Sequence, residues 1–332
     1  MLLALPWWTF ALGMAAALGL ALAVDRWLGE PPVRWHPVVW IGDYLGWAGR
    51  RVAPSMGDAS SPAGRFAAGA VAWCMGAAVV VGVAVALQAA LWRLPWWLAV
   101  PLLGVLLKPL LAWRMLRGEV LAVEAALGVS LAAGRARLAH LVSRDVQALD
   151  AAEVRESAIE SLAENLNDSV VAPVLWFVLF GLPGAALYRF ANTADAMWGY
   201  RGERGGCDWT WAGKWAARAD DVLSWVPARL TACLLWVGRA PEAQSRPSLA
   251  VLRTEARRTP SPNSGWPMAA MALRLGIRLG KPGVYTLNAA GRAPVAADTH
   301  AAVARGGRAV VLLSLCALPM FLLVAFGARG HA

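Results

Sequence analysis

Long apolar stretches with few or no charged residues are the main feature of this sequence. They cover residues 7–24, 66–92, 94–113 and 309–327. About 20 apolar residues are needed to cross the hydrocarbon core of a bilayer, so we predict that each stretch is a transmembrane helix. Asp25 and Arg26 follow the first stretch, where a signal peptide would have a small-residue cleavage site. We therefore expect this helix to be retained.

Two more apolar stretches, 170–187 and 222–237, contain prolines. Pro173 and Pro183 lie in the first and Pro227 lies in the second, and an internal proline kinks or breaks a helix. The polar segments around these stretches must also lie on one side of the membrane if their side chains form one site. We therefore predict buried, broken or re-entrant helices that do not cross, because irregular backbone at that depth must lie inside protein or against water.

The polar segments between the apolar stretches carry the candidate chemistry. They cover residues 25–65, 114–169, 189–221 and 239–308. Charged and small apolar residues alternate at helical spacing in 114–167, which predicts helix. We expect an all-α, multi-pass integral membrane protein with about four full spans, broken or re-entrant helices and helical cytoplasmic loops. It is predicted to form a single domain over residues 1–332.

The composition supports the same class of protein. Of the 332 residues, 58% are hydrophobic and 16% are charged, whereas about a quarter of the residues in soluble domains are charged. The net charge is +10, and the excess of basic residues in 239–308 predicts that this segment is cytoplasmic. No interleaved pattern of basic and aromatic residues indicates nucleic-acid binding. The four cysteines lack the spacing of a metal site.

Acidic residues at four-residue steps directly precede the apolar stretch 170–187. Glu156, Glu160, Glu164 and Asp168 would share one face of a helix, and no basic residue lies between them in the sequence. Such an acidic ridge at a membrane boundary is costly unless a cation binds it, and Mg²⁺ with a phosphate is the natural candidate. The alternative interpretation is a solvated helix face.

Two smaller clusters of polar residues lie near the two ends of the segment 189–221. Asn192, Thr193 and Asp195 could orient a metal or a ribose, and helix capping is the alternative. Asp220 and Asp221 begin the next apolar stretch, where adjacent carboxylates either bind a metal or cap a helix.

A turn rich in proline and serine is a candidate anion site. It extends from Ser261 to Pro267 and is preceded by Arg253, Arg257 and Arg258. Backbone amides at a helix start, flanked by arginines, favour anions, and a rigid capping loop is the alternative. His36, in the loop 25–65, is either a ligand contact or general base, or ordinary polar surface. The motifs GxxxxGK[ST], GxGxxG and HExxH are absent.

Five segments together resemble the CbiB/CobD family of cobalamin biosynthesis. They are DRWLGEPPVRWHPVVWIG, ESLAENLNDSVVAP, ANTADAMWGY, ADDVLSWVPARLTA and SPNSGWPMAAMA. The likeness extends from about Asp25 to Tyr285. It implies a multi-pass enzyme of the bacterial inner membrane that uses ATP and Mg²⁺. Such an enzyme joins aminopropanol, or its phosphate, to a carboxylate of the corrinoid adenosylcobyric acid, giving adenosylcobinamide or its phosphate.

The chemistry of such an amide ligation, which needs Mg²⁺, cations over the phosphoryl group and a base for the amine, predicts roles for individual residues. The metal ligands implied are Glu164, Asp168, Asp195, Asp220 and Asp221. Proton transfer is implied for Glu160 or His36, with Glu164 in the same catalytic group. The residues predicted to contact ATP are Asn165, Asn192, Thr193, Lys214, Arg229, Arg258, Ser261, Asn263 and Gly265, of which Lys214, Arg229 and Arg258 would neutralise phosphate charge. The sequence departs from the family pattern at Lys281, which interrupts a turn that is commonly Gly-Gly-Pro, and at Glu30 and Ser143.

The implied partners are the two substrates, membrane lipid and other late enzymes of the cobalamin pathway, and the active site is expected to face the cytoplasm. An alternative is a non-enzymatic membrane sensor or accessory protein of a related family linked to β-lactamase regulation. That alternative predicts gaps in the acidic and SPNxG motifs, whereas both motifs are intact here. A transporter would favour paired inverted halves, and no internal repeat is evident.

Overall fold

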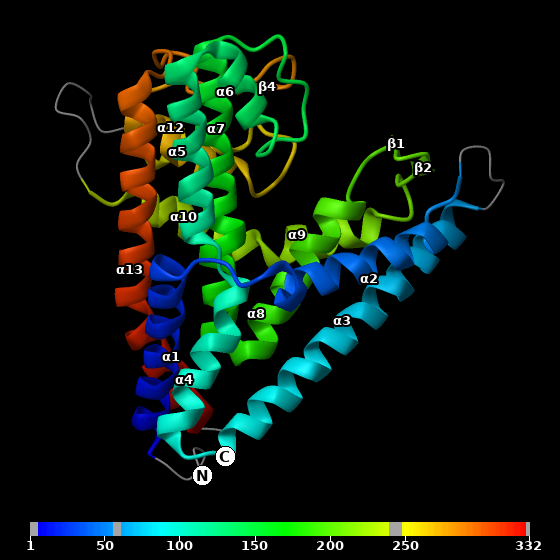
Figure 1. Ribbon diagram of the computed structural model, residues 1–332, viewed down its shortest axis with the longest axis vertical. Coiled ribbons are helices and arrows are strands. Elements are labelled where there is room, and N and C mark those ends of the chain that lie inside the picture. The colour runs from blue at the N-terminus through cyan, green and yellow to red at the C-terminus, as the bar shows by residue number, and fades with distance from the viewer. Residues whose placement is uncertain (1–5, 56–60, 239–247, 330–332) are drawn as a thin grey trace. The chain divides into compact units, whose positions relative to one another are not determined.

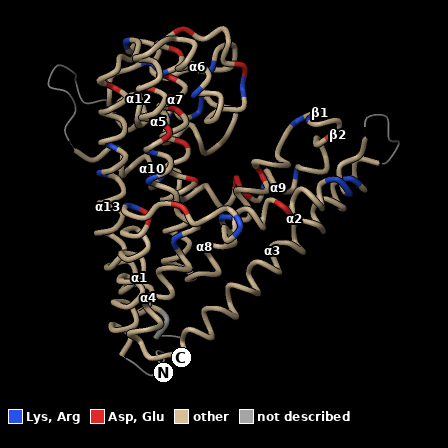
Figure 2. The backbone as a smooth tube through the Cα atoms, viewed as in Figure 1, with Lys and Arg blue, Asp and Glu red and all other residues tan. Residues whose placement is uncertain are grey.

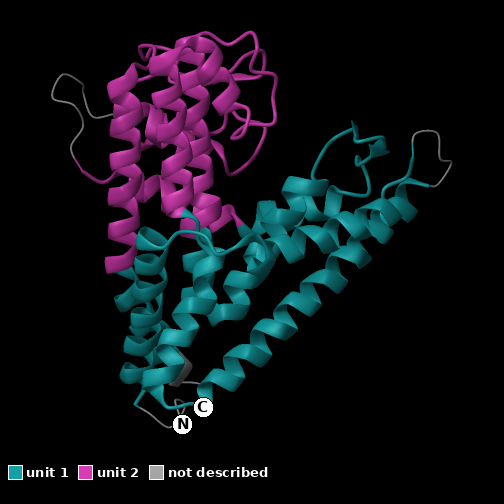
Figure 3. Ribbon diagram, in the orientation of Figure 1, with its two compact units in different colours: residues 1–112, 172–223, 316–332 teal, residues 113–171, 224–315 magenta. Residues whose placement is uncertain are grey.

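We describe a computed structural model of the protein, which covers residues 6–55, 61–238 and 248–329. Its regular structure is helical apart from two short antiparallel hairpins (Figure 1). The predicted all-α class is therefore confirmed. Residues 239–247, at the start of the expected segment 239–308, lie outside the described residues. The chain divides into two compact units (Figure 3).

Unit 1 comprises residues 1–112, 172–223 and 316–332. Its longer helices are α1 (Trp7–Trp27), α2 (Pro37–Val52), α3 (Pro62–Trp92), α4 (Trp96–Leu107), α8 (Ala172–Trp198), α9 (Lys214–Leu223) and the end of α13 (Ala296–Arg329). Two 3₁₀ turns, η2 (Val33–Trp35) and η3 (Lys108–Leu110), and a hairpin of β1 (Glu203–Arg204) and β2 (Cys207–Asp208) complete it. Long parts of α1, α3 and α4 carry no charge, as expected for segments in lipid (Figure 2).

Glycines allow close packing between elements of unit 1. A Cβ atom on Gly69 of α3 would lie 1.9 Å from the carbonyl oxygen of Ala212, and one on Gly104 of α4 would lie 2.8 Å from that of Ala17 in α1. Small residues at such contacts let helices approach closely in a membrane, where no hydrophobic effect drives helices together.

An aromatic core connects α2, α3 and α8. The ring centres of Trp73 and Phe190 are 5.5 Å apart, and Trp198 stacks on Trp209 at 6.0 Å. The buried indole Nε1 of Trp198 donates a hydrogen bond to the carbonyl oxygen of Leu45 at 3.2 Å. The buried tryptophan thus satisfies its one donor, as a polar group away from water requires.

The apolar stretch 170–187 is broken, as predicted. Within α8, Gly181 has φ 68° and ψ −154°, which is not helical, and Pro183 follows two residues later. The backbone N–H of Leu182, freed by this break, donates to Oε1 of Gln88 in α3 at 2.7 Å. A side chain of another helix therefore satisfies the irregular backbone, as a buried break requires.

Unit 2 comprises residues 113–171 and 224–315. Its elements are α5 (Trp113–Val129), α6 (Leu131–Leu138), α7 (Ala151–Leu166), the π-helical η4 (Asn167–Val171), α10 (Trp225–Trp236), α11 (Leu249–Ala256), α12 (Gly265–Leu275), a hairpin of β3 (Leu279–Lys281) and β4 (Tyr285–Leu287), and the first part of α13. In the hairpin, Leu279 pairs with Leu287 and Lys281 pairs with Tyr285.

A complete capping box fixes the start of α7. The side chain of Asp150 accepts from the N–H of Glu153 at 2.8 Å, and the side chain of Glu153 accepts from the N–H of Asp150 at 2.8 Å. Two of the otherwise unpaired N–H groups at the helix start are thereby satisfied. This start sets which face of α7 carries Glu156, Glu160 and Glu164.

Among the described residues, five helical segments are long and apolar enough to cross a membrane. They are Trp7–Trp27, Pro62–Trp92, Trp96–Val129, Ala151–Trp198 and Ala296–Gly327. The protein is therefore a multi-pass membrane protein by composition. Four of these segments overlap the four predicted spans. The additional one is Ala151–Trp198, which contains the broken stretch 170–187. The other interrupted stretch, 222–237, is divided between α9 and α10, and α10 has only 12 residues.

Candidate functional site

A small polar cavity of about 180 Å³ lies in unit 2 beside α7. The charged and polar side chains that line it are Arg144, Ser157, Glu160, Ser161, Glu164, Asn165, Lys281 and Tyr285. The glutamates come from α7, Arg144 comes from the segment between α6 and α7, and Lys281 and Tyr285 come from the β3–β4 hairpin. The structure thus brings Glu160, Glu164 and Asn165 together, three residues for which the sequence predicts a role.

Arginines that are distant in the sequence neutralise part of the acidic ridge. Nη2 of Arg144 lies 2.9 Å from Oε2 of Glu160, and Nη2 of Arg278 lies 3.0 Å from Oε1 of Glu156. Glu156 and Glu160 are each only 3% exposed. The alternative of a solvated helix face is therefore wrong for these two residues, and buried charges in such a position need partners of this kind.

The hydroxyl of Tyr285 adds a neutral donor to the cavity. Burial raises the pKa of Tyr285, and the nearby carboxylates of Glu160 and Glu164 raise it further. The hydroxyl therefore keeps its proton at physiological pH, and it donates a hydrogen bond to Sδ of Met268 at 3.8 Å. Sequence reasoning assigned no role to Tyr285 or Arg144, and the signal for Lys281 was its departure from the family pattern.

Asp168 lies in the π-helical turn η4, just beyond α7. Its Oδ1 accepts from Nδ2 of Asn167 at 2.8 Å, and Oδ1 of Asn167 in turn accepts from the hydroxyl of Thr231 in α10 at 3.0 Å. Asp168 and Glu164 are both partly exposed. Single π turns inside helices are often found at functional sites.

A second and larger cavity of unit 2, about 630 Å³, lies beside the proline-rich loop. Its lining includes Trp225, Arg229, Arg253, Arg257, Ser261 and Trp266. Arg229 is held by the loop itself, because Nη1 donates to Oδ1 of Asn263 at 2.6 Å and Nη2 donates to the carbonyl oxygen of Pro262 at 3.1 Å. Burial lowers the pKa of Arg229.

The remaining loop residues have structural contacts of their own. The hydroxyl of Ser261 accepts from the N–H of Asn263 at 3.2 Å. Gly265 begins α12, where a Cβ atom would lie 2.1 Å from the carbonyl oxygen of Ala256. Arg258 pairs with Glu255 at 3.0 Å and does not line the loop cavity, whereas the exposed Arg253 and Arg257 do.

The other predicted site residues lie in unit 1. Nδ2 of Asn192 is 3.5 Å from Oδ1 of Asp220. The hydroxyl of Thr193 donates to the carbonyl oxygen of Arg189 within α8 at 2.7 Å. Nζ of Lys214 lies 3.8 Å from the ring centre of Trp211. The structure thus joins two of the predicted clusters, those of Asn192 and of Asp220, by one long hydrogen bond.

The two remaining predicted metal ligands of unit 1 are Asp195 and Asp221. A Cβ atom on Gly199 would lie 1.9 Å from Oδ1 of Asp195, so glycine at this position makes room for the carboxylate. Burial raises the pKa of Asp221. In the described part of the chain, no three His, Cys, Asp or Glu side chains gather as a metal-binding group.

His36 belongs to a cluster of charged groups in unit 1. Its Nδ1 accepts from the N–H of Val38 at 3.3 Å, as the N-cap of α2, and its Nε2 lies 3.1 Å from Oε2 of Glu30. The same carboxylate oxygen accepts from Nζ of Lys108 at 2.6 Å, and Lys108 also lies 3.4 Å from Asp25. Both ring nitrogens of His36 are thus engaged, and Nε2 would have to leave Glu30 to act as a base.

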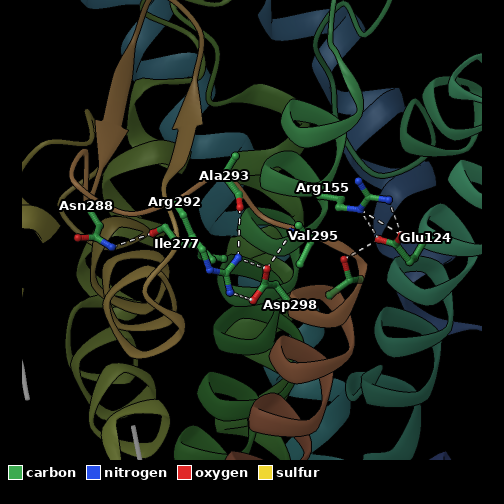
Figure 4. A network of polar contacts seen from close by, with 9 residues as sticks. Glu124, Arg155, Ile277, Asn288, Arg292, Ala293, Val295 and Asp298 are labelled. Atoms are coloured by element: carbon green, nitrogen blue, oxygen red, sulfur yellow. Dashed lines mark hydrogen bonds and ion pairs between the residues drawn. The ribbon is translucent and has the colours of Figure 1, made fainter. Parts of the chain in front are cut away.

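A network of ion pairs fixes α5, α7 and the start of α13 in unit 2 (Figure 4). Arg155 binds Glu124 through two nitrogens at 2.8 to 3.1 Å, and the hydroxyl of Thr299 donates to the same carboxylate at 2.8 Å. Arg292 pairs with Asp298 at 2.6 and 2.7 Å, and this hydrogen bonding raises the pKa of Arg292. Sequence reasoning missed this network, which positions α7 and hence the cavity.

The fold and site define a helical, multi-pass membrane protein with a charged cavity beside a buried acidic helix. The family model "CobD/Cbib protein" matches residues 18–313. The chain therefore belongs to the CobD/CbiB family of cobalamin biosynthesis.

Individual relatives extend this comparison. A "Probable cobalamin biosynthesis protein CobD" of Pyrococcus abyssi is 42% identical over 81% of this chain and 83% of its own. A protein of the same description from Methanothrix thermoacetophila is 35% identical over 93% and 97%. A "Cobalamin biosynthesis protein CobD" of Chromobacterium violaceum is 40% identical over 80% and 81%. No solved structure shows significant similarity to the chain.

Proposed function

We propose that this protein is an amide ligase of the inner membrane whose site faces the cytoplasm. It joins (R)-1-amino-2-propanol, or its O-phosphate, to adenosylcobyric acid with the use of ATP and Mg²⁺. The product is adenosylcobinamide or adenosylcobinamide phosphate. Membership of the family supports the pathway. The observation that carries the chemistry is the small cavity that combines Glu160 and Glu164 with Arg144 and Lys281.

Amide formation requires the substrate carboxylate to be activated first. The γ-phosphoryl group of ATP passes to a carboxylate oxygen and ADP leaves, which gives an acyl phosphate. The amine nitrogen then attacks the acyl carbon and loses a proton, and inorganic phosphate leaves. Such phosphoryl transfer depends on cations placed over the migrating group, and the second step depends on a base near the amine.

Glu160 fits the role of the base. It is buried, lines the cavity and holds only one of its two oxygens in the ion pair with Arg144. A carboxylate in such a position can take the proton that the nitrogen loses when the amide bond forms. General-base groups of this kind contribute about 10²–10⁴-fold to a rate.

Glu164 and Asp168 fit the binding of Mg²⁺. Mg²⁺ is commonly held by one or two carboxylates together with substrate phosphates and water, so a group of three acidic ligands is not required. Both residues are partly exposed and lie one turn apart at the junction of α7 and η4. When bound, the ion would offset the negative charge of the phosphate groups. Asp195, Asp220 and Asp221 of unit 1 are further candidate ligands.

The loop cavity fits the phosphates of ATP. Arg253 and Arg257 line it and are exposed, while Arg229 and Asn263 hold the loop in place. We therefore assign phosphate contacts first to Arg253 and Arg257, together with Ser261. Arg258, Lys214, Asn165, Asn192, Thr193 and Gly265 remain predicted nucleotide contacts.

The large, partly apolar corrinoid needs flat surfaces, which tryptophans offer. Trp198 and Trp209 are buried and stack on each other, so they serve the core of unit 1. Trp266 lines the loop cavity, and Trp211 is 36% exposed. We propose these two as the tryptophans to test for corrinoid binding.

One assay tests the proposal directly. Purified protein in detergent is incubated with ATP, Mg²⁺, adenosylcobyric acid and each amine, and the products are identified by mass. We expect the amide product and one ADP for each amide formed, both abolished by omission of Mg²⁺. Absence of the amide under conditions that activate a related ligase would favour the sensor alternative.

A further inference from the structure

The exposed face of α2 in unit 1 combines tryptophans with charged residues. Residues at steps of three, four and seven share one side of a helix. The opposite side carries Ile41, Leu45 and Ala48, which are buried in the core of unit 1. The exposed residues of α2 are Trp40, Asp43, Trp47, Arg50 and Arg51.

The turn η2 adds a third tryptophan next to α2. Trp35 is 61% exposed, and the guanidinium group of Arg34 lies 5.7 Å from its ring centre. The indole Nε1 of Trp40 donates to the carbonyl oxygen of Arg34 at 3.1 Å, which joins the turn to α2. The loop before η2 is anchored by Glu30, whose Oε2 lies 2.6 Å from Nζ of Lys108 in η3. This surface is therefore preformed.

A surface of this composition suits neither bulk water nor hydrocarbon. Trp40 and Trp47 are 53% and 50% exposed, and large apolar side chains gathered on a surface mark a contact with another apolar phase. The charges of Asp43, Arg50 and Arg51 would be costly inside hydrocarbon. The membrane–water interface suits both, because a tryptophan there keeps its ring in an apolar layer and its N–H in a polar one.

The neighbouring spans place α2 at this interface. The charge-free part of α1 ends before Asp25, and Arg65 is the last charged residue before the apolar stretch 66–92 of α3. The segment that contains α2 therefore begins and ends where a candidate span meets the polar layer. Figure 1 shows that α2 runs across the end of α1 and does not continue along its axis.

We propose that α2 lies in the plane of the membrane interface and that its exposed face binds the headgroups of anionic phospholipids. Interfacial helices commonly combine arginines with tryptophans in this way. The guanidinium group of Arg51 lies 4.1 Å from the ring centre of Trp47 and donates one hydrogen bond to the carbonyl oxygen of that residue. A guanidinium group has five N–H donors, so Arg51 keeps donors for a lipid phosphate, and Arg50 adds a second positive charge.

Spin labels test the depth of α2 in a bilayer. In a full-length variant whose four cysteines are replaced by serine, one nitroxide is attached at Val33→Cys or at Asp43→Cys, and the protein is reconstituted in phosphatidylglycerol. Collisions with oxygen, which concentrates in hydrocarbon, are compared with collisions with a water-soluble nickel chelate. The references are the exposed Met75 in the apolar stretch of α3 and the exposed Val284 in the β3–β4 hairpin. We expect positions 33 and 43 to give values between the two references.

Native mass spectrometry of the full-length protein in detergent measures headgroup binding separately. The protein is titrated with phosphatidylglycerol, with phosphatidylcholine of the same acyl chains, and with glycerol 3-phosphate, which has no acyl chains. We expect phosphatidylglycerol to bind at least about tenfold more tightly than phosphatidylcholine, because each basic residue favours anionic lipid. Glycerol 3-phosphate is expected to show no measurable binding.

Two variants test the arginines. Arg50→Gln and Arg51→Gln are each expected to weaken phosphatidylglycerol about fivefold and to leave phosphatidylcholine within about twofold. The control is Arg137→Gln, which removes a positive charge from unit 2, where Arg137 pairs with Glu119. It should leave both affinities within about twofold. Thermal unfolding of each variant shows whether it is folded.

Each contrary result has a distinct meaning. Nickel access at positions 33 and 43 as high as at Val284, or oxygen access as high as at Met75, would place α2 outside the interface and overturn the proposal. Low access to both reagents would indicate that a protein partner covers this face and would also overturn it. Equal affinity for the two lipids, tight binding of glycerol 3-phosphate, or unchanged affinity in folded Arg50→Gln and Arg51→Gln would reject the headgroup site. None of these results depends on amide formation.

Discussion

Arg229 and Asn263 connect α10 to the proline-rich loop by a hydrogen bond of 2.6 Å between Nη1 and Oδ1. The guanidinium group of Arg229 also lies 4.5 Å from the ring centre of Trp225 and 4.9 Å from that of Trp266. The planar guanidinium group of Arg229 thus makes two cation–π contacts and also donates a hydrogen bond to the loop. This arrangement keeps Arg253 and Arg257 beside a loop of fixed shape.

Replacing Arg229 by lysine is expected to destabilise the loop although it keeps the charge. Lysine cannot donate through a planar fork or stack in the same way, and hydrogen bonds to charged groups are worth about 1.5–3 kcal/mol. Faster proteolysis within residues 259–266 would report the change. Asn263→Ala should have a similar effect, and the double variant should be little worse than either. Additive effects would contradict the coupling.

Glu160→Gln and Glu164→Gln are expected to lower the rate of amide formation by at least about 10²-fold, because a proposed base and a proposed metal ligand are lost. Glu119→Gln is the matched control. This residue also lies in unit 2, but it pairs with Arg137 at a partly exposed position. Single-turnover rates at saturating ATP measure the effect. Near-normal rates in the two cavity variants would show that the acidic ridge is structural.

Arg144→Ala is expected to destabilise unit 2 more than Glu160→Gln does. Removal of one partner from a buried ion pair leaves an uncompensated charge and costs about 3–5 kcal/mol. The side chain of Glu160 is only 4% exposed. Thermal unfolding of the single variants and of Arg144→Ala/Glu160→Gln would measure the coupling. The double variant should be more stable than Arg144→Ala alone, and a further loss would contradict a pair of this kind.

The β1–β2 hairpin is expected to lose stability in acid. Hydrogen bonding from Thr210 lowers the pKa of Asp208, and the nearby Arg65 lowers it further. A carboxyl with a lowered folded-state pKa stabilises the fold above its unfolded pKa of about 3.9. That contribution disappears as the pH falls through the folded-state pKa. Asp208→Asn should flatten the pH dependence of thermal unfolding below about pH 4, and an unchanged slope would contradict this.

Gly69→Ala and Gly82→Ala change the same helix with opposite expected effects. A Cβ atom on Gly69 would lie 1.9 Å from the carbonyl oxygen of Ala212, whereas nothing lies within 4 Å of one on Gly82. Overpacking of this kind costs about 1–3 kcal/mol, while alanine in an open helical position gains up to about 1 kcal/mol. Thermal unfolding in detergent should show a lower midpoint for Gly69→Ala only.

Local pattern was sufficient to predict much of the fold. The charge-free stretches gave the long helices, and two prolines in 170–187 indicated the break that the structure has at Gly181. The number of helical segments that are long and apolar enough to cross the membrane was not predictable in this way, since the structure has five among its described residues and the sequence predicted four. Length and composition also allow the broken segment within Ala151–Trp198 to span.

The site could be predicted only where its residues are neighbours in sequence. The four-residue spacing placed Glu160 and Glu164 on one face of α7. The partner of Glu156, however, is Arg278, 122 residues away, and no local pattern links them. The same holds for Lys281 and Tyr285, which reach the cavity because a hairpin packs beside α7.

The contact between Gln88 and the N–H of Leu182 constrains how this protein can assemble in the membrane. Gln88 precedes Leu182 by 94 residues in the sequence, so α3 is synthesised before the broken helix. Until the two meet, the broken backbone would leave a polar group in hydrocarbon, which costs several kcal/mol. The interruption in α8 therefore becomes permissible only once α3 has been inserted, and the earlier helix serves as a template for the later one.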